Sequence, residues 1–334
     1  MTSRERGLEK MKRAKAGGGP AHGGAPNKAF ISSSTNIYKN APLAEAIGNI
    51  ARAGIDCVEI GIPHVPEIER GGAEALAALA KTGTTVYSIH AGLPEHSDFT
   101  KANFFKNHHE FYSALFDFGR KCNARVMVVH LNRDELSEWD KHKRQIALNC
   151  RQFADWAASY KMIFSVENAW SRGGLPKSPR QFKELLGMAG RENLAVTLDI
   201  KHAAMSGAPA SRPEDFIREV GRHIVNCHFT ELEYPEFEII ELGDWGIPGT
   251  GTGTRLTKIL ESLKKTGYQG AITLELNEYF LRKVLEIVVN VLKRTGVDVK
   301  GIEKTLCSRP SLEEKILRYA SDFLARSGLL QTKQ

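Results

Sequence analysis

The chain has 334 residues, of which 42% are hydrophobic and 25% are charged, a composition typical of folded, enzyme-sized proteins. No apolar run approaches the ~20 residues needed to cross a bilayer, and the N-terminus lacks the apolar core of a secretory signal. We therefore expect a cytoplasmic protein without a membrane span. Whether the net charge of +7 indicates a nucleic-acid partner depends on where in the chain the charged residues lie.

Most of this charge lies at the start of the chain. Residues 1–28 hold seven Lys or Arg and two Glu, a balance of +5, which leaves only +2 for the rest of the chain. This segment is rich in Gly and Pro and cannot bury a core, so we predict a disordered basic tail. Since the remaining chain has no basic footprint, a nucleic-acid partner is not expected. The five cysteines include no C-x-x-C pair, which predicts a reducing compartment and no disulfide framework or zinc knuckle.

After the tail, short apolar runs rich in Val, Ile and Thr alternate with longer amphipathic stretches. The short runs are bounded by Gly, Asn, Lys or Pro, which is typical of β-strands. We predict strands at 29–33, 57–62, 84–90, 124–130, 162–167, 194–199, 223–228 and 271–275. The amphipathic stretches, several of which end in Gly, predict helices. These lie at 42–54, 67–83, 103–121, 137–160, 178–190, 212–221, 255–267 and 278–296.

This alternation predicts the fold class, an α/β protein built as a single (β/α)8 TIM barrel over residues 29–296. A doubly wound sheet is disfavoured because no G-x-G-x-x-G turn follows the first strand. Residues 297–334 are predicted to form a C-terminal extension with an extra helix over 311–328.

The predicted strands end on polar side chains that are able to bind a metal ion. From the third strand to the eighth, these residues are His90, His130, Glu167, Asp199, His228 and Glu275. The second strand contributes Glu59. Taken alone, Asp199 is better explained as the N-cap of the next helix. The carboxyl ends of parallel barrel strands meet at one mouth, however, and burying several carboxylates there without a counter-charge is costly.

A divalent cation would compensate that cost, because carboxylates and neutral imidazoles are its natural ligands. The mixed oxygen and nitrogen donors without thiolate suit Mn²⁺, Mg²⁺, Co²⁺ or Zn²⁺, and the histidines disfavour Ca²⁺. A purely structural polar cluster is the alternative interpretation.

Five motifs add a resemblance to a known family. They are SVEN at 165–168, LDIKHA at 198–203, CHFTE at 227–231, PGTGTG at 248–253 and TLELN at 273–277. With these motifs the chain resembles the xylose-isomerase-like TIM-barrel superfamily of sugar phosphate isomerases and epimerases, which also includes the AP endonuclease family 2. The resemblance spans about residues 29–290.

The resemblance implies the roles of individual residues. It implies that Glu167, Asp199, His228 and Glu275 hold one divalent metal ion, with Mn²⁺ expected first. It also implies that Glu167 and Glu275 are catalytic and exchange the substrate proton, and that His202 contacts the substrate. The remaining candidate substrate-binding residues are Glu59, His90, His130, Trp170, Arg172 and Lys201.

The expected activity is that of a divalent-metal-dependent sugar or polyol-ketone isomerase or epimerase. A C–H bond beside a ketone is too weak an acid for an unaided carboxylate, so a metal-stabilised enediolate with two carboxylates as base and acid is the expected route. An inosose-dehydratase-like enzyme or a deglycosylating lyase would share this step. The segment HFTELEYPEF lacks the Arg that 3-epimerases generally carry there, which argues against a simple tagatose- or psicose-type specificity.

An endonuclease IV-like zinc AP endonuclease is a further alternative, since His90 and His130 match its additional zinc ligands. The Asp-x-His motif of its third metal is missing, because Asp244 has no histidine two places on. The expected partner is therefore a small carbohydrate, without a membrane or nucleic acid, and assembly into a homo-oligomer stays open.

Overall fold

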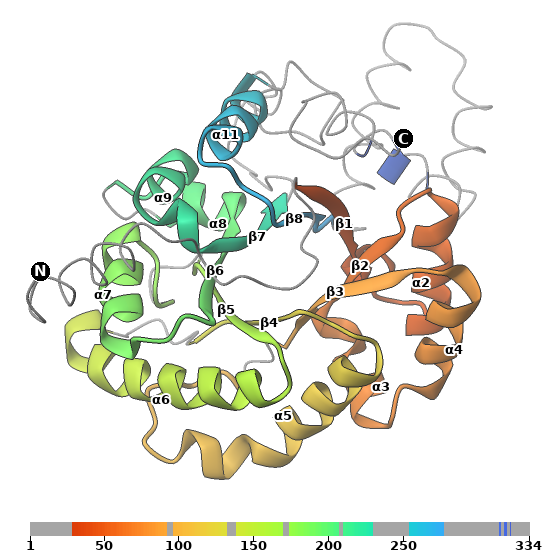
Figure 1. Cartoon of the computed structure of the whole chain (residues 1–334), viewed down its shortest axis with the longest axis horizontal. Coiled ribbons are helices and arrows are strands. Elements are labelled where there is room, and N and C mark those ends of the chain that lie inside the picture. Colours follow the sequence, from red (N-terminus) through yellow and green to blue (C-terminus); the bar gives the residue numbers. More distant parts are fainter. Residues whose placement is uncertain are drawn as a thin grey trace, which may run out of the picture.

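Eight parallel strands close into a barrel in sequence order (Figure 1). The computed structural model describes residues 29–91, 96–131, 138–169, 174–206, 210–229 and 254–276, together with residues 314, 317, 318 and 321. The strands are β1 (Phe30–Ser34), β2 (Cys57–Ile60), β3 (Thr85–His90), β4 (Val126–Val129), β5 (Ile163–Glu167), β6 (Leu194–Asp199), β7 (Ile224–Phe229) and β8 (Ala271–Leu274). The barrel closes because β1 pairs with β8 as well as with β2. The predicted (β/α)8 fold is confirmed.

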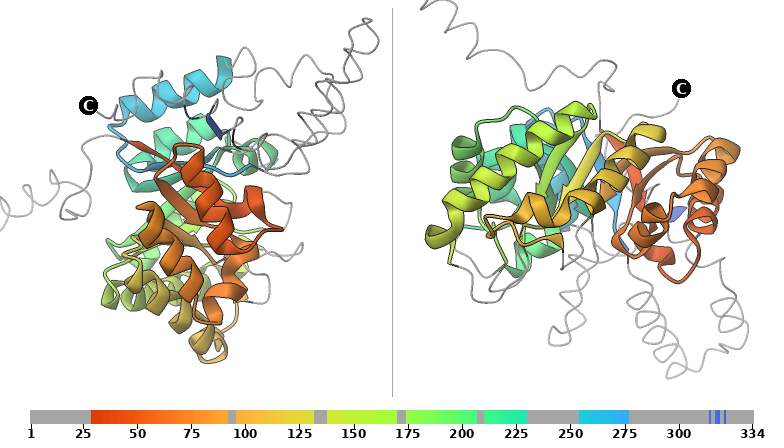
Figure 2. Two further views of the ribbon diagram at one scale, coloured as in Figure 1. Left: turned by 90° about the vertical axis from the view of Figure 1, so that its right-hand side faces the viewer. Right: turned by 90° about the horizontal axis from the view of Figure 1, so that it is seen from below.

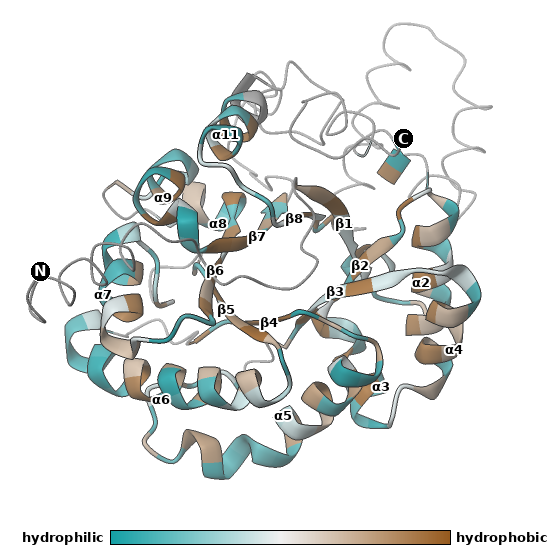
Figure 3. Cartoon of the chain, in the orientation of Figure 1, coloured by the Kyte–Doolittle hydropathy of each residue, from teal (hydrophilic) through white to brown (hydrophobic). Residues whose placement is uncertain are grey.

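Helices surround the barrel. They are α2 (Leu43–Arg52), α3 (Val65–Glu69), α4 (Ala73–Thr82), α5 (Phe104–Lys121), α6 (Trp139–Ser159), α7 (Pro179–Ala189), α8 (Ile200–Met205), α9 (Pro213–Val220) and α11 (Thr254–Lys265). Within the described ranges the 3-10 turns η1 (Thr35–Tyr38), η2 (Ile62–His64) and η4 (Gly221–His223) lie in the connections. The larger ring helices carry both apolar and hydrophilic residues, as expected of helices with one buried and one exposed face (Figure 3).

The core between strands and helices is rich in aromatic residues where α5 and α6 lie side by side (Figure 2). The Phe153 ring lies with its centroid 4.4 Å from that of Phe164 on β5 and 4.7 Å, edge to face, from that of Tyr112. All three side chains are fully buried, and each such ring contributes a large apolar area to the core. This packing anchors β5, the strand that ends on Glu167.

Inside the barrel, the inward-pointing side chains of neighbouring strands form layers that follow one another from the amino to the carboxyl end. Because side chains alternate along a strand, positions i, i+2 and i+4 share a face. This gives Ile163, Ser165 and Glu167 on β5 and Ala195, Thr197 and Asp199 on β6. Thus an apolar layer is followed by a hydroxyl layer and then by a carboxylate layer. The hydroxyl layer is bonded internally, with Ser165 Oγ 2.7 Å from Thr197 Oγ1.

One element differs from expectation. The sequence pattern predicted a single helix over 67–83, but the structure contains two helices, α3 and α4. The break falls at Gly71 and Gly72, whose φ angles are +105° and +58°. This left-handed region favours glycine, and a Cβ at Gly72 would also meet the Phe118 ring. The prediction was wrong because it treated this Gly pair as part of a helical surface.

The predicted C-terminal helix is described at four positions. Glu314, Leu317, Arg318 and Ser321 are helical. Leu317 is fully buried, and Arg318 Nη2 donates to the carbonyl of Arg52 at the end of α2. The predicted tail at 1–28 and the predicted helix at 278–296 lie outside the described residues. Within the described part of the chain, no helix has the length and apolarity needed to span a membrane, and the four cysteines there are free.

Candidate metal centre

The polar residues predicted to meet at one barrel mouth are brought together there. His90, Glu167 and Asp199 are the last residues of β3, β5 and β6. His130 and Glu275 directly follow β4 and β8, because these strands end one residue earlier than predicted. His228 is the penultimate residue of β7, and Glu59 lies within β2. The parallel register explains the convergence, since Asp199 pairs directly with His228.

Glu167 lies at the centre of the cluster and faces four imidazoles. Its Oε2 is 3.0 Å from His90 Nε2 and 3.3 Å from His130 Nε2. Its Oε1 is 3.0 Å from His202 Nδ1 and 3.5 Å from His228 Nδ1. The Glu167 side chain is fully buried, so these imidazoles form its polar surroundings.

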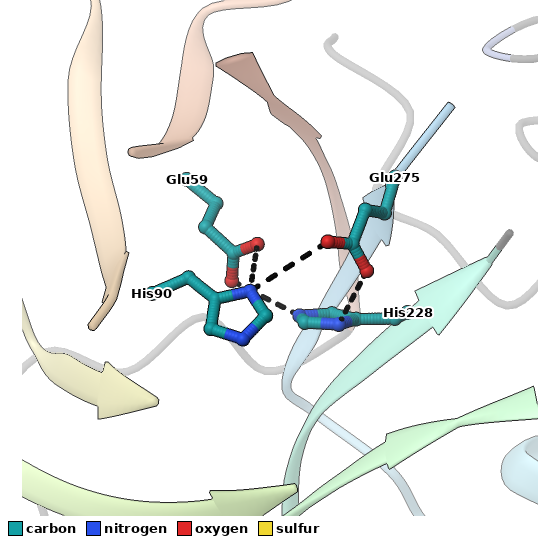
Figure 4. A group of neighbouring side chains, drawn as sticks. All are labelled: Glu59, His90, His228 and Glu275. Carbon is teal, nitrogen blue, oxygen red and sulfur yellow. Dashed lines mark hydrogen bonds and ion pairs between the residues drawn. The ribbon is translucent and has the colours of Figure 1, made fainter. Parts of the chain in front are cut away.

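A second set of contacts lies between β2, β3, β7 and β8 (Figure 4). His228 Nδ1 is 3.0 Å from Glu275 Oε2, and His228 Nε2 is 3.0 Å from Glu59 Oε2. His90 Nδ1 lies 3.6 Å from Glu275 Oε1 and 3.7 Å from Glu59 Oε1. Glu275 is the most accessible of these four, with its side chain 14% exposed.

Asp199 combines its predicted cap with a place in the cluster. Its Oδ1 accepts the backbone N–H of His202 at 2.7 Å and so caps α8. The Asn168 side chain holds the Asp199 backbone in both directions, accepting from its N–H at 2.8 Å and donating to its carbonyl at 3.0 Å. Lys201 lies half-buried in the first turn of the same helix. Asp199 therefore occupies a position fixed by its neighbours on β5 and α8.

Three polar residues that the sequence interpretation missed bind the glutamates. Asn36 in η1 donates to Glu275 Oε1 at 2.6 Å. Ser88 Oγ and Asn226 Nδ2 donate to Glu59 Oε2 at 2.8 and 3.0 Å. Ser88 and Asn226 precede His90 and His228 by two residues, so strand alternation could have revealed both. Asn36 has no such signal, because it lies in a turn.

The carboxylates of the cluster fall into two groups by their pKa values. Burial opposes ionisation of Glu59, but the charge of His228 and its hydrogen bond outweigh burial and lower the pKa of Glu59 to about 2. Burial is likewise outweighed for the other two glutamates. The pKa of Glu167 is lowered chiefly by the charge of His130, and that of Glu275 chiefly by the charge of His228. In contrast, burial raises the pKa of Asp199, and the nearby Glu167 charge adds to that effect.

The histidines show the reciprocal effect. Burial by itself favours the neutral imidazole and lowers the pKa. For His90 the Glu167 charge overcomes burial, and for His228 the Glu59 charge does, so both pKa values are raised well above the usual value. The pKa of His202 is raised in the same way by Asp199. Each of these imidazoles and its neighbouring carboxylate thus favour each other's charged form.

The donor set fits a divalent cation. Glu59 Oε1 and His90 Nδ1 are fully buried, have no hydrogen-bond partner and lie 3.7 Å apart. Buried polar atoms without partners are rare, and an ion is one of the groups that satisfies them. Three sets of side chains place one ligand atom each within 4.8 Å of one another. They are Glu59, His90, His228 and Glu275; His90, His130 and Glu167; and Glu167, Asp199, His228 and Glu275.

The predicted site residues are thus largely assembled in one place. The structure brings together all seven strand-borne residues, and His202 joins them from α8 through its contact with Glu167. Trp170 and Arg172 lie outside the described residues. The ligand, catalytic and substrate-binding roles assigned to these side chains stay predictions.

Fold and site together define a (β/α)8 barrel with a cluster at its carboxyl end that is able to bind a metal ion. The profile of the xylose isomerase-like TIM barrel family matches residues 47–294. The chain therefore belongs to this family. No curated protein matches its sequence.

Solved structures with the same fold include several sugar epimerases. A D-allulose 3-epimerase from Methylomonas sp. superposes with a TM-score of 0.64 at 16% identity, covering 91% of this chain and 99% of its own. A D-psicose 3-epimerase with D-tagatose from Clostridium cellulolyticum H10 gives a TM-score of 0.65 at 17% identity, covering 91% and 100%. A probable 3-DHS dehydratase from Bacillus anthracis gives a TM-score of 0.57 at 15% identity, covering 75% of this chain and 92% of its own. At these identities the likeness concerns the fold.

Proposed function

We propose that the protein is a divalent-metal-dependent sugar isomerase or epimerase that transfers a proton beside a substrate carbonyl. The observation that carries this proposal is the buried cluster of carboxylates and imidazoles at the carboxyl ends of the strands. Family membership and the sugar epimerases of similar fold support the substrate class. Active sites of (β/α)8 enzymes lie at this end of the barrel.

Glu167, Asp199, His228 and Glu275 would hold the cation, with Mn²⁺ as the expected ion. Within this set His228 Nδ1 lies 3.0 Å from Glu275 Oε2 and 3.5 Å from Glu167 Oε1. When bound, the cation would polarise the substrate carbonyl and lower the barrier to removal of the adjacent proton.

Glu167 and Glu275 would act as base and acid. They enter the cluster from β5 and β8, which are not neighbouring strands of the barrel. One of the two carboxylates, ionised, would accept the proton beside the carbonyl, and the other, protonated, would return a proton on the opposite face. Asn36 fixes the orientation of the Glu275 carboxylate through its 2.6 Å hydrogen bond. His202 and Lys201 on α8 remain the proposed substrate contacts.

Solvent exchange tests this proposal directly. Metal-free protein is loaded with Mn²⁺ and incubated in D₂O with a panel of ketopentoses and ketohexoses, and deuterium beside the carbonyl is read by mass spectrometry. We expect incorporation that is lost on chelation and on Glu275→Gln. The matched control is Glu219→Gln, which makes the same chemical change in a surface ion pair with Lys183.

Two results would contradict the proposal. One is exchange that persists at full rate in Glu275→Gln. The other is the absence of exchange with every ketose offered. Analysis of the products then separates epimerisation and isomerisation from loss of water, since all three begin with the same proton removal.

A further inference from the structure

We propose that a second divalent cation binds between β2, β3 and β8, held by Glu59 Oε1, His90 Nδ1 and Glu275 Oε1 (Figure 4). This inference rests on the proposed cation at Glu167, Asp199, His228 and Glu275, and it adds a neighbouring position that shares Glu275. It assigns Glu59 and His90, predicted from the sequence to bind substrate, to metal binding.

The two oxygens of the Glu59 carboxylate differ in their contacts. Its Oε2 accepts hydrogen bonds from Ser88 Oγ and Asn226 Nδ2 and contacts His228 Nε2. Its Oε1 has no hydrogen-bond partner, although the side chain is fully buried. A carboxylate that is saturated on one oxygen and bare on the other directs the bare oxygen at a missing partner. His90 Nδ1, also buried and without a hydrogen bond, faces the same point.

The distances from His90 Nδ1 to the two carboxylates are longer than hydrogen bonds. His90 Nδ1 is 3.7 Å from Glu59 Oε1 and 3.6 Å from Glu275 Oε1, too far for hydrogen bonds. Two ligand atoms bound to one cation at about 2.1 Å, with tetrahedral angles between them, lie about 3.4 Å apart. By contrast, the other nitrogen of the same ring lies 3.0 Å from Glu167 Oε2, within hydrogen-bond range. The distances from His90 Nδ1 to Glu59 and Glu275 are thus those of ligands of one cation, whereas the distance from Nε2 to Glu167 is that of a hydrogen bond.

The two positions use different oxygens of Glu275 and nitrogens of different histidines. His228 offers Nδ1 to the first position, beside Glu275 Oε2 at 3.0 Å. The second position takes Glu275 Oε1 instead, so this carboxylate bridges, as carboxylates do in paired-metal sites. Glu275 Oε1 also accepts from Asn36 Nδ2, and a carboxylate oxygen has lone pairs for both.

The two histidines connect the positions reciprocally. Metal-binding imidazoles usually donate their other N–H to a carboxylate, which fixes the ring orientation. His228, a ligand of the first position, faces Glu59 with Nε2 at 3.0 Å. His90, a ligand of the second, faces Glu167 with Nε2 at 3.0 Å. Each position therefore supplies the carboxylate that orients the imidazole of the other, a relationship that a single-ion site would not need.

Metal counting tests the inference. Full-length protein is stripped with a chelator, titrated with Mn²⁺ alone by calorimetry, and analysed for bound manganese and for the electron paramagnetic resonance of coupled ions. We expect two Mn²⁺ per chain with a spin-coupled signal. Glu59→Gln keeps the volume and a hydrogen-bond acceptor for His228, and we expect it to retain one Mn²⁺ and to lose the coupled signal.

Two control variants separate this position from its neighbours. Ser88→Ala removes a hydrogen bond to Glu59 Oε2 but no ligand, so it should still bind two ions. His130→Ala removes a member of the set His90, His130 and Glu167, and it should also bind two. Thermal unfolding of each metal-free variant checks that it is folded, and Glu59→Asp replaces Glu59→Gln as the test variant if the latter is not.

The outcomes distinguish this inference from the proposed function. Wild-type protein that binds one Mn²⁺ and catalyses exchange overturns the second position alone. Two ions in wild type that persist in Glu59→Gln but fall to one in His130→Ala also overturn it. Wild-type protein that binds no Mn²⁺ overturns both this inference and the metal dependence of the proposed function.

Discussion

The two ends of the barrel interior are built from the same strands yet have opposite chemistry. At the amino end, Cys57, Tyr87, Val126, Val128, Ile163, Ala195 and Ala271 form a small buried apolar cluster. At the carboxyl end, two to four residues further along those strands, the interior is filled with carboxylates and imidazoles. On β4, β5 and β6 strand alternation accounts for this, because positions two residues apart share the inward face while the residue type changes. Stability and chemistry are thus assigned to opposite ends.

The largest expected effect is on catalysis at the carboxyl end. Glu167→Gln should lower the exchange rate by about 10²–10⁴-fold, the usual contribution of a general acid or base. The thermal midpoint of the metal-free variant should also fall, because the imidazoles around Glu167 lose their counter-charge. Exchange is therefore compared for the folded fraction of each protein, and a rate equal to that of wild type would contradict the catalytic role of Glu167.

The complementary change lies at the amino end. Ile163→Ala removes most of a buried side chain from the apolar layer of β5 and should lower the free energy of unfolding by about 2–5 kcal/mol. The exchange rate of the folded fraction at low temperature should stay as in wild type. Urea unfolding and exchange, measured on the same sample, would contradict the division if the rate fell too.

Removing the cation should lower stability through the carboxyl end of the barrel alone. A ligand present at 100 times its Kd stabilises the state that binds it by about 2.7 kcal/mol. Chelation should therefore lower the thermal midpoint of wild type, and by a similar amount that of Ile163→Ala. If the Ile163→Ala protein lost no further stability on chelation, the two ends would be coupled.

The metal-free protein should lose stability as the pH rises above neutrality. The raised pKa values of His90 and His228 mean that their contribution is complete below about pH 6.5 and is lost as the pH climbs through the folded-state values. Glu59, with a pKa of about 2, contributes above about pH 4.3 and loses its contribution as the pH falls toward 2. Metal affinity should run the other way and increase with pH, because the ligand imidazoles must be neutral. Thermal melts from pH 5 to 9, with and without Mn²⁺, would reveal the crossing trends.

The smallest expected effect comes from a single hydroxyl at the amino end. Tyr87 Oη donates to the Val225 carbonyl at 2.7 Å, a partly buried contact between β3 and β7. Tyr87→Phe should cost about 1 kcal/mol of unfolding free energy and leave metal content and exchange unchanged. Metal content that differed from wild type would show that the amino end transmits strain to the cluster.

The strand ends could be predicted from the sequence, because an apolar run that stops on a His, Asp or Glu is a local signal. Asp199 is the clearest example, since its strand, its cap and its place in the ring were all expected and β6 has the predicted bounds. Glu59 gave a weaker signal. It lies inside β2 beside a shift in register between Val58 and Glu59, and only the folded barrel brings it under His228.

Other features had no local signal. Asn36 binds Glu275 from 239 residues away, and nothing in its turn sequence predicts that partner. The break between α3 and α4 was missed because a Gly pair within an otherwise helical pattern is tolerated on some helix surfaces. Its necessity comes from the ring of Phe118, which belongs to another helix. Such contacts depend on the closure of the barrel.

Asn168 has a consequence for how this protein is able to change over evolution. Its side chain bonds the Asp199 backbone at both the N–H and the carbonyl, and so adds one side-chain rung to the ladder between β5 and β6. The spacing of Glu167 and Asp199 is therefore set before the chain enters the connection that follows. That connection is able to acquire insertions or a new substrate preference while the two carboxylates keep their places. Asn168 would thus let the loop after β5 change in sequence while Glu167 and Asp199 keep their positions.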